Sequence, residues 1–262
     1  MTEIPHSWLW PDWPAPASVR ACSTSRQGGV SRAPRDSLNL GLHVGDDAEH
    51  VGINRARLMR RLALPREPAW LSQVHGSRVI DASTDCDGVK ADAAVAFESG
   101  VVCAVLTADC LPVLFCDRAG SRVAAAHAGW RGLLAGVLEA TVEVLAARPG
   151  ELMAWFGPAI GPAAFEVGPE VRDAFIAHYA GSAAAFAPTP AGRWLADIYQ
   201  LARLRLSALG VTAVYGGGLC TYSDSARFFS YRGEKCTGRM ASLIWLTLKS
   251  PSKSPFCKGG RA

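Results

Sequence analysis

The feature that most constrains this chain is the stretch Val101–Gly132, with the sequence VVCAVLTADCLPVLFCDRAGSRVAAAHAGWRG. It holds two apolar runs, which end in Asp109-Cys110 and in His127-Ala128-Gly129-Trp130. Each run is short, rich in β-branched residues and bounded by glycine or proline, so it predicts a buried strand with a polar group at its end. A buried polar group without a partner costs about 1–3 kcal/mol, so these side chains need hydrogen bonds or a ligand. We therefore expect chemistry at the ends of two strands, which a turn at 117–120 joins.

Helix and strand patterns alternate along the rest of the chain. A helix is predicted over 48–62, with Asp46 and Asp47 as N-caps, and another over 131–147, which has one apolar face. Strands are also predicted over 18–22, 69–74, 91–97, 151–156, 194–196, 211–215 and 240–248, and helices over 169–179 and 197–209. No repeat or interior linker interrupts this pattern. It predicts a single α/β domain of mixed α+β type over residues 1–248, followed by a disordered basic tail over 249–262.

Composition narrows the class of protein. Of the 262 residues, 49% are hydrophobic and 19% are charged, which is enough for a full core. The formal net charge of +4 equals the four cationic residues of the tail, so the body is neutral and lacks the basic face of a nucleic-acid-binding protein. There is no basic segment followed by an apolar one at the start, no uninterrupted apolar span, and no CxxC spacing among the eight cysteines. We expect a cytoplasmic protein with reduced thiols that binds neither nucleic acid nor membrane.

Two segments have the composition of an anion site. The loop after the 18–22 strand contains Arg26 followed by Gln27-Gly28-Gly29, which would present a guanidinium beside backbone amides. A solvated arginine on a flexible loop is the alternative. The segment His127–Gly132 leads from a strand into a helix, where free amides and the helix dipole favour a phosphate. Neither segment has the glycine spacing of a Rossmann or P-loop motif.

Three side chains are suited to a metal ion. His75 ends the predicted 69–74 strand, and Cys110 and His127 end the two apolar runs. Ligands far apart in sequence are typical of a catalytic zinc site, whereas structural zinc favours ligands in close pairs. Two imidazoles and a thiolate suit zinc and leave a position for water, whose pKa the ion would lower to about 7. Asp109 would then orient a ligand or act as a base.

The same residues fit other interpretations. Cys110 and His127 could be the nucleophile and base of a hydrolase, or the polar groups could be unrelated ends of core strands. On the residues alone, these alternatives and the zinc site stay open. Copper oxidase chemistry is less favoured, because coupled copper centres would need roughly ten histidine ligands in all. The chain has six histidines.

Seven motifs, spread from about residue 17 to 248, resemble those of one protein family. They are Ser25–Ser31 (SRQGGVS), Asn39–Gly41 (NLG) with Val44–Asp46 (VGD), Gln73–Gly76 (QVHG), Thr107–Pro112 (TADCLP), His127–Gly132 (HAGWRG), Gly157–Gly161 (GPAIG) and Phe228–Arg232 (FFSYR). In these motifs the chain resembles the laccase-domain family, the YfiH-type proteins once called polyphenol oxidases. The resemblance implies a mixed α/β fold of layered sheets flanked by helices.

The resemblance also implies a function. It is that of a broad-specificity purine nucleoside phosphorylase, which acts on adenosine, inosine and methylthioadenosine with phosphate as co-substrate and also deaminates adenosine. It implies a zinc ion held by His75, Cys110 and His127, with copper as the alternative metal. We predict catalytic roles for Asp109, Cys110 and His127, and we expect a monomer or small homo-oligomer. Contacts to nucleoside or phosphate are predicted for Arg26, Asn39, Gln73, Gly129 and Arg131.

The chain departs from the family in two places. Many members have a pair of cysteines after the GPAIGP turn, where this chain has Ala163-Ala164. A role of those thiols would therefore not apply here. The tail after Leu248 has no counterpart in the family, and neither change touches the predicted metal ligands.

Overall fold

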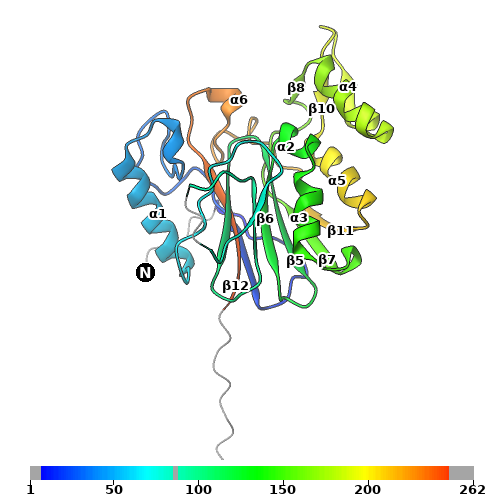
Figure 1. Cartoon of the computed structure of the whole chain (residues 1–262). Helices are drawn as coiled ribbons and strands as arrows, with labels where there is room; N and C mark the ends of the chain where they lie inside the picture. The colour runs from blue at the N-terminus through cyan, green and yellow to red at the C-terminus, as the bar shows by residue number, and fades with distance from the viewer. Residues whose placement is uncertain (1–6, 85–87, 248–262) are drawn as a thin grey trace, which may run out of the picture.

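Two β-sheets packed face to face form the centre of the molecule, and helices cover their outer faces (Figure 1). The computed structural model describes residues 7–84 and 88–247. The strands are β1 (Val19–Ser23), β2 (Val79–Asp81), β3 (Ala93–Ala96), β4 (Val102–Thr107), β5 (Leu111–Asp117), β6 (Val123–Ala128), β7 (Leu152–Phe156), β8 (Glu166–Val167), β9 (Phe186–Pro188), β10 (Trp194–Ala196), β11 (Ala213–Gly216) and β12 (Met240–Leu246). The α-helices are α1 (Ala48–Leu62), α2 (Trp130–Leu134), α3 (Val137–Leu145), α4 (Pro169–His178), α5 (Ile198–Ala208) and α6 (Tyr231–Glu234). Short 3₁₀ helices are η1 (Leu42–Val44), η2 (Pro149–Glu151) and η3 (Ala180–Ala185).

The sheets differ in size and strand direction. The first has three antiparallel strands in the order β1-β12-β4. The second has six strands in the order β11-β7-β5-β6-β3-β2, antiparallel except for the outer pairs β11–β7 and β2–β3. A small third sheet, β8-β10-β9, contacts α4. The predicted single domain of layered mixed sheets flanked by helices is confirmed.

Strand β5 shows why its stretch of sequence is a continuous apolar run in which polar and apolar residues do not alternate. Val113 and Phe115 point into the core that α3 and α5 cover, whereas Leu114 and Cys116 point into the core between the two large sheets. Both faces of the strand are therefore buried, and every residue of β5 is buried. A strand buried on both faces has a continuous apolar run in its sequence rather than a period of two.

Helix α1 covers the outer face of the three-stranded sheet. Leu58 and Leu62 pack there against strands β1, β4 and β12. The helix begins and ends where the sequence predicted, and Asp47 is the N-cap, because its carboxylate accepts a hydrogen bond from the Glu49 amide at 2.8 Å. Asp46 instead accepts a hydrogen bond from the Asn39 side chain at 2.8 Å.

Three predicted elements need correction. The two strands predicted in the Val101–Gly132 stretch are three, because the chain turns at Asp109, with φ of 91°, and passes from β4 in one sheet to β5 in the other. The predicted 131–147 helix is interrupted at Gly136, whose φ of 90° is incompatible with a right-handed helix, so α2 and α3 are separate. The predicted 69–74 strand makes only isolated bridges, Ala69 with Cys103 and Ser72 with Lys90.

Two other sequence predictions concern the basic tail and the absence of a membrane-spanning segment. The basic tail over 249–262 lies outside the described residues. Within the ranges 7–84 and 88–247, no helix is long and apolar enough to cross a membrane.

Candidate active site and metal centre

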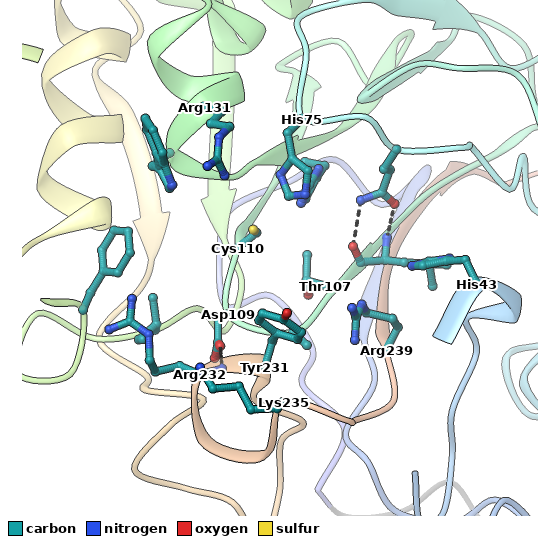
Figure 2. A pocket seen from close by; sticks show the side chains of 17 residues that line it. His43, His75, Thr107, Asp109, Cys110, Arg131, Tyr231, Arg232, Lys235 and Arg239 are labelled. Atoms are coloured by element: carbon teal, nitrogen blue, oxygen red, sulfur yellow. Dashed lines mark hydrogen bonds between the residues drawn. The ribbon is translucent and has the colours of Figure 1, made fainter. Parts of the chain in front are cut away.

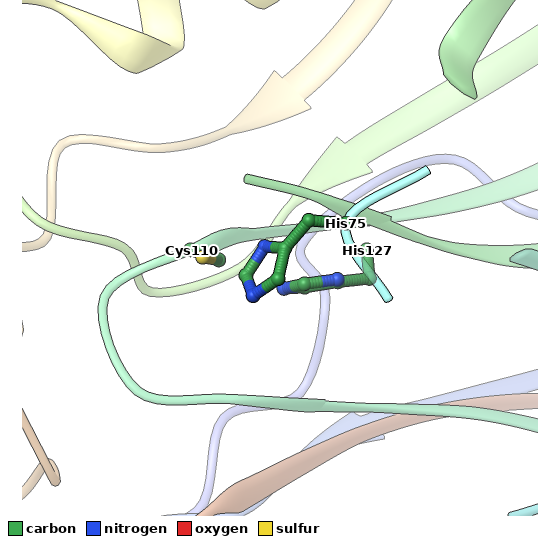
Figure 3. Close-up of side chains that lie close together, drawn as sticks. All are labelled: His75, Cys110 and His127. Atoms are coloured by element: carbon green, nitrogen blue, oxygen red, sulfur yellow. The ribbon is translucent and has the colours of Figure 1, made fainter. Parts of the chain in front are cut away.

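His75, Cys110 and His127 lie close together, as Figure 3 shows, at the end of the sheets where β5 begins and β6 ends. His75 lies on the segment that precedes β2, Cys110 in the turn between β4 and β5, and His127 near the end of β6. One nitrogen of each imidazole and the Cys110 sulfur lie within 4.8 Å of one another. Among the described residues, this is the one group of three or more His, Cys, Asp or Glu side chains close enough to hold a metal ion. The structure thus brings the three predicted ligands together.

A buried carboxylate, Asp92, holds two of these residues in place. Its side chain is completely buried just before β3. Its oxygens accept hydrogen bonds from the amides of Val74 at 3.2 Å, His75 at 2.9 Å and Gly76 at 2.7 Å. Oδ1 also lies 2.9 Å from His127 Nδ1. Asp92 therefore positions the backbone of one imidazole ligand and the ring of the other.

The contact with Asp92 determines which nitrogen of His127 is available. An ionised carboxylate only accepts hydrogen bonds, so Nδ1 of His127 carries the proton and Nε2 faces Cys110. Carboxylate-bound imidazoles of this kind are typical of metal centres, where the carboxylate fixes the ring and raises its basicity. A soft thiolate and two imidazoles are the donors that zinc prefers, so the residues present fit a zinc ion.

Gly129 leaves the space in which Cys110 and His75 approach each other. A Cβ atom at position 129 would lie 2.9 Å from both the Cys110 sulfur and Nδ1 of His75. The backbone of Gly129 is in an ordinary extended conformation, with φ of −65° and ψ of 161°. The glycine is thus required by close packing and not by its backbone angles.

Charge interactions within the centre favour a thiolate. Burial raises the pKa of the Cys110 thiol, but attraction to His127 and hydrogen bonds from His127 and His75 outweigh it and lower the pKa to about 6. Burial lowers the pKa of His127, but the Cys110 thiolate and Asp92 outweigh it and raise the pKa to about 9. Both shifts favour a thiolate on Cys110 and an imidazolium on His127 when no metal is bound.

The three ligands line a cavity of about 660 Å³ with an unusual concentration of positive charge. Figure 2 shows Arg131 and His75 on one side of Cys110, and Tyr231 and Lys235 on the other. The cationic side chains that line the cavity are Arg131, Arg232, Lys235 and Arg239. None of them forms a salt bridge with a carboxylate in the described ranges. Because the body of the protein is neutral, this local excess of cations favours an anionic ligand.

The four cations differ in how firmly the protein holds them. Arg232 donates to the carbonyls of Ala164 and Glu166, and Arg239 donates to those of Thr237 and Gly238. The guanidinium of Arg131 lies 4.3 Å from the centre of the Trp130 ring, and no hydrogen bond from it to another described residue is found. Its donors are therefore available to a ligand.

Thr107 adds a polar group to the cavity wall. It is 2% exposed, and its hydroxyl has no hydrogen-bond partner among the described residues. A buried hydroxyl without a partner costs about 1–3 kcal/mol. A ligand that bonds to Thr107 would remove this cost.

The other predicted site residues fall into two groups. Gln73 lines the cavity, but the oxygen and the nitrogen of its side-chain amide are both hydrogen-bonded to the backbone of Leu106. Asp109 also lines the cavity, and its carboxylate accepts hydrogen bonds from Thr221 Oγ1 and from the Arg232 amide, each at 2.6 Å. The carboxylate that contacts His75 and His127 is that of Asp92, and the predicted role of Asp109 as a base or as a group that orients a ligand stays a prediction. Arg26 and Asn39 do not line this cavity. Arg26 lines a separate one, and Asn39 supports the backbone of Gly41 and Arg239.

The sequence of the chain matches the family described as multi-copper polyphenol oxidoreductase laccase over residues 20–247. The chain belongs to this family. Two relatives that are similar over nearly their whole length are named for a different activity. A Pseudomonas aeruginosa protein named purine nucleoside phosphorylase is 62% identical over 92% of this chain and 99% of its own. The Escherichia coli K12 protein named purine nucleoside phosphorylase YfiH is 58% identical over 90% of this chain and 97% of its own.

Solved structures of the family have the same fold. A Neisseria meningitidis protein assigned to family DUF152 superposes with a TM-score of 0.89 at 52% identity, covering 92% of this chain and all of its own. YlmD from Geobacillus stearothermophilus superposes with a TM-score of 0.87 at 33% identity, covering 94% of this chain and 98% of its own. The resemblance found in the sequence motifs is confirmed.

Sequence reasoning missed several residues of this family member's site. Asp92 was the one with a detectable signal, since a charged residue interrupts an apolar segment directly before a buried strand. Three other residues line the cavity: His43 in the 3₁₀ helix η1, and Lys235 and Arg239 in the segment after α6. Polar side chains are common in such short connecting segments, so the sequence did not mark these three. Tyr231 and Arg232 lie in the predicted FFSYR motif, but their position beside Cys110 depends on the tertiary fold.

Proposed function

We propose that this chain is a zinc-dependent purine nucleoside phosphorylase of broad specificity, acting on adenosine, inosine and methylthioadenosine, with adenosine deaminase activity. The observation that carries the proposal is the His75–Cys110–His127 centre opening into a cavity lined by four cations, none of which pairs with a carboxylate of residues 7–84 or 88–247. The names of the P. aeruginosa and E. coli relatives support the phosphorylase part. A bound zinc would act as a Lewis acid and would supply a water with a pKa of about 7.

Phosphorolysis requires phosphate beside C1′ of the ribose while the bond from C1′ to the purine nitrogen breaks. We assign phosphate primarily to Arg131, because its guanidinium keeps its donors available, with Lys235 as a second cation. A charge-assisted hydrogen bond to phosphate contributes about 1.5–3 kcal/mol. Arg26 is not part of this assignment, since its donors are bonded to protein groups.

The cavity also has a surface suited to a purine. Trp130 and Phe165 supply aromatic faces, and Ile160 supplies an aliphatic one. Flat, uncharged bases bind to such surfaces by stacking and burial of apolar area. The hydroxyl of Thr107 would bond to a polar edge of the nucleoside, which agrees with its having no hydrogen-bond partner in the part of the chain that the structure describes. Few specific polar contacts to the base would permit several purine nucleosides as substrates.

Two other activities remain as alternatives. Copper-dependent oxidation is favoured by the description of the matched family, but the described residues supply one candidate metal centre with three donors. A multicopper oxidase needs further histidine ligands. A thiol hydrolase is favoured by the lowered pKa of Cys110 beside His127. Metal content distinguishes these activities, because the hydrolase would need no metal.

The test combines metal analysis with product analysis. We expect about one zinc per chain, and formation of ribose-1-phosphate and hypoxanthine from inosine only when phosphate is present. Inosine formation from adenosine without phosphate tests the deaminase part separately. Arg131→Gln should raise the KM for phosphate, whereas Arg118→Gln, at an exposed site in the β5–β6 turn, should not. Oxygen-dependent oxidation of phenols by a copper-loaded protein without phosphorolysis would contradict the proposal.

A further inference from the structure

Helix α6 forms one wall of the cavity but is too short to be stable by itself. It spans four residues, Tyr231–Glu234, and isolated helices of this length are not stable in water. Three side chains from α6 and the residue after it line the cavity: Tyr231, Arg232 and Lys235. Contacts with the rest of the protein must therefore hold these side chains in position.

Two carboxylates hold α6, one near each end. At the beginning, the Arg232 amide donates to Asp109 at 2.6 Å, and Ser230 caps the helix by accepting from the Gly233 amide at 3.1 Å. At the end, Glu234 accepts from Thr237 Oγ1 and from Nη1 of Arg26, the latter at 2.6 Å. Within the described part of the chain, the pair with Arg26 is the one salt bridge that ties α6 to another segment.

Arg26 is built into the protein as a fixed donor. Its Nε donates to the Asp36 carbonyl at 2.9 Å, and its Nη1 also donates to the Ser225 carbonyl at 3.0 Å. The guanidinium lies 4.7 Å from the centre of the buried Phe229 ring, and its side chain is 11% exposed. These protein partners fix the Arg26 guanidinium in the position where it pairs with Glu234. Arg26 does not line the cavity that contains His75, Cys110 and His127.

We propose that Arg26 is a positioning residue, which acts through Glu234 to hold α6 and thereby places Tyr231, Arg232 and Lys235 around the bound nucleoside and phosphate. Arg26 itself contacts neither substrate. This proposal rests on the proposed phosphorylase function for its kinetic readout. It also predicts a structural effect that does not depend on any activity, because α6 loses an anchor when either partner of the pair is removed.

The test compares four variants with a matched control. The variants are Arg26→Ala, Glu234→Gln, the double variant and Arg26→Lys. The control is Glu139→Gln, which removes the carboxylate partner of Arg205 in a salt bridge between α3 and α5. The two salt bridges are similarly exposed: the side chains of Arg205 and Glu139 are 7% and 32% exposed, and those of Arg26 and Glu234 are 11% and 29% exposed. For each protein we would measure zinc content, kcat and KM for inosine and phosphate, and hydrogen exchange of the peptide covering 228–237.

We expect Arg26→Ala and Glu234→Gln each to lower kcat/KM by about ten- to a hundredfold, mainly through KM, because substrate contacts made by α6 are displaced. The double variant should be no worse than the poorer single variant, since both remove the same interaction. Zinc content should not change. Arg26→Lys should recover part of the loss, because an ammonium can pair with Glu234 but cannot reproduce the guanidinium's bonds to both carbonyls. The control should stay within about twofold of the unmodified protein.

Two results would overturn the proposal. If Arg26→Ala impairs catalysis while Glu234→Gln does not, or if their effects multiply, then Arg26 acts on substrate directly. If the protein has no phosphorylase activity, hydrogen exchange decides: faster exchange over 228–237 in both single variants supports the anchor, and unchanged exchange contradicts it. Glu234→Gln keeps Arg26 and its backbone contacts, so it remains informative if Arg26→Ala fails to fold.

Discussion

Replacing Asp92 by asparagine should weaken metal binding although Asp92 is not one of the three predicted ligands. The substitution preserves the size of the side chain and one oxygen. In the structure, Oδ1 accepts from the His75 amide and His127 Nδ1, whereas Oδ2 accepts from the amides of Val74 and Gly76. Whichever way an asparagine turns, its NH₂ group faces two donors and can accept from neither.

The size of the effect follows from these bonds. Two buried or partly buried donors lose their acceptor, and each costs about 1–3 kcal/mol, so the free energy of unfolding should fall by about 2–6 kcal/mol. Residues that orient metal ligands contribute about ten- to a hundredfold to metal affinity. We expect the dissociation constant for zinc to rise by that factor, because the His75 backbone and the His127 ring both lose their support.

Asp117→Asn is the matched control. Asp117 is also a buried carboxylate bonded to backbone, accepting from the amides of Ser121 at 2.7 Å and Arg122 at 3.2 Å in the β5–β6 turn. Both amides donate to one oxygen, Oδ1, so the asparagine keeps these bonds and loses the charge that attracts Arg122. It should lose some stability, less than Asp92→Asn, without a change in zinc affinity. Zinc affinity would be measured by competition with a chromogenic chelator, and stability by urea denaturation of the metal-free proteins.

Two outcomes would refute the reasoning about Asp92. Asp92→Asn could bind zinc as tightly as the unmodified protein, which would show that the ligands are positioned without the carboxylate. Alternatively, both substitutions could weaken zinc binding equally, in which case the loss would reflect general destabilisation.

Three further predictions concern the centre itself. Cys110→Ala should abolish zinc binding and both activities while circular dichroism shows a folded protein, because it removes one of three donors; phosphorolysis by a folded variant would exclude the assignment. Gly129→Ala should lower zinc affinity without a comparable loss of stability, since its Cβ would lie 2.9 Å from the Cys110 sulfur. In the metal-free protein, the pKa of Cys110 is lowered from 9.0 to about 6, so alkylation at Cys110 should remain fast at pH 7 and slow only as the pH falls through about 6, which peptide mapping would show. The thiolate's contribution to stability is likewise lost as the pH falls through that value.

The sequence by itself determined the elements that follow from local rules. Helix α1 begins and ends as predicted because its apolar spacing and its basic end lie within its fifteen residues and its cap, Asp47, directly precedes them. Strands β6 and β7 follow from apolar runs bounded by glycine, and helix α4 begins at Pro169 directly after a turn rich in glycine and proline. The three candidate metal ligands were predicted because each one lies at the end of a predicted strand.

Only the tertiary structure decided which polar groups act together. The turn at Asp109 sends β4 and β5 into different sheets, and an apolar run gives no sign of this because both strands are buried on both faces. The segment that begins at Arg26 has the composition of an anion site, but in the structure Arg26 pairs with Glu234, which is 208 residues away in the sequence. Asp92 likewise reaches His127 across 35 residues. Contacts between distant segments depend on sheet order and packing, and neither leaves a periodic pattern in the sequence.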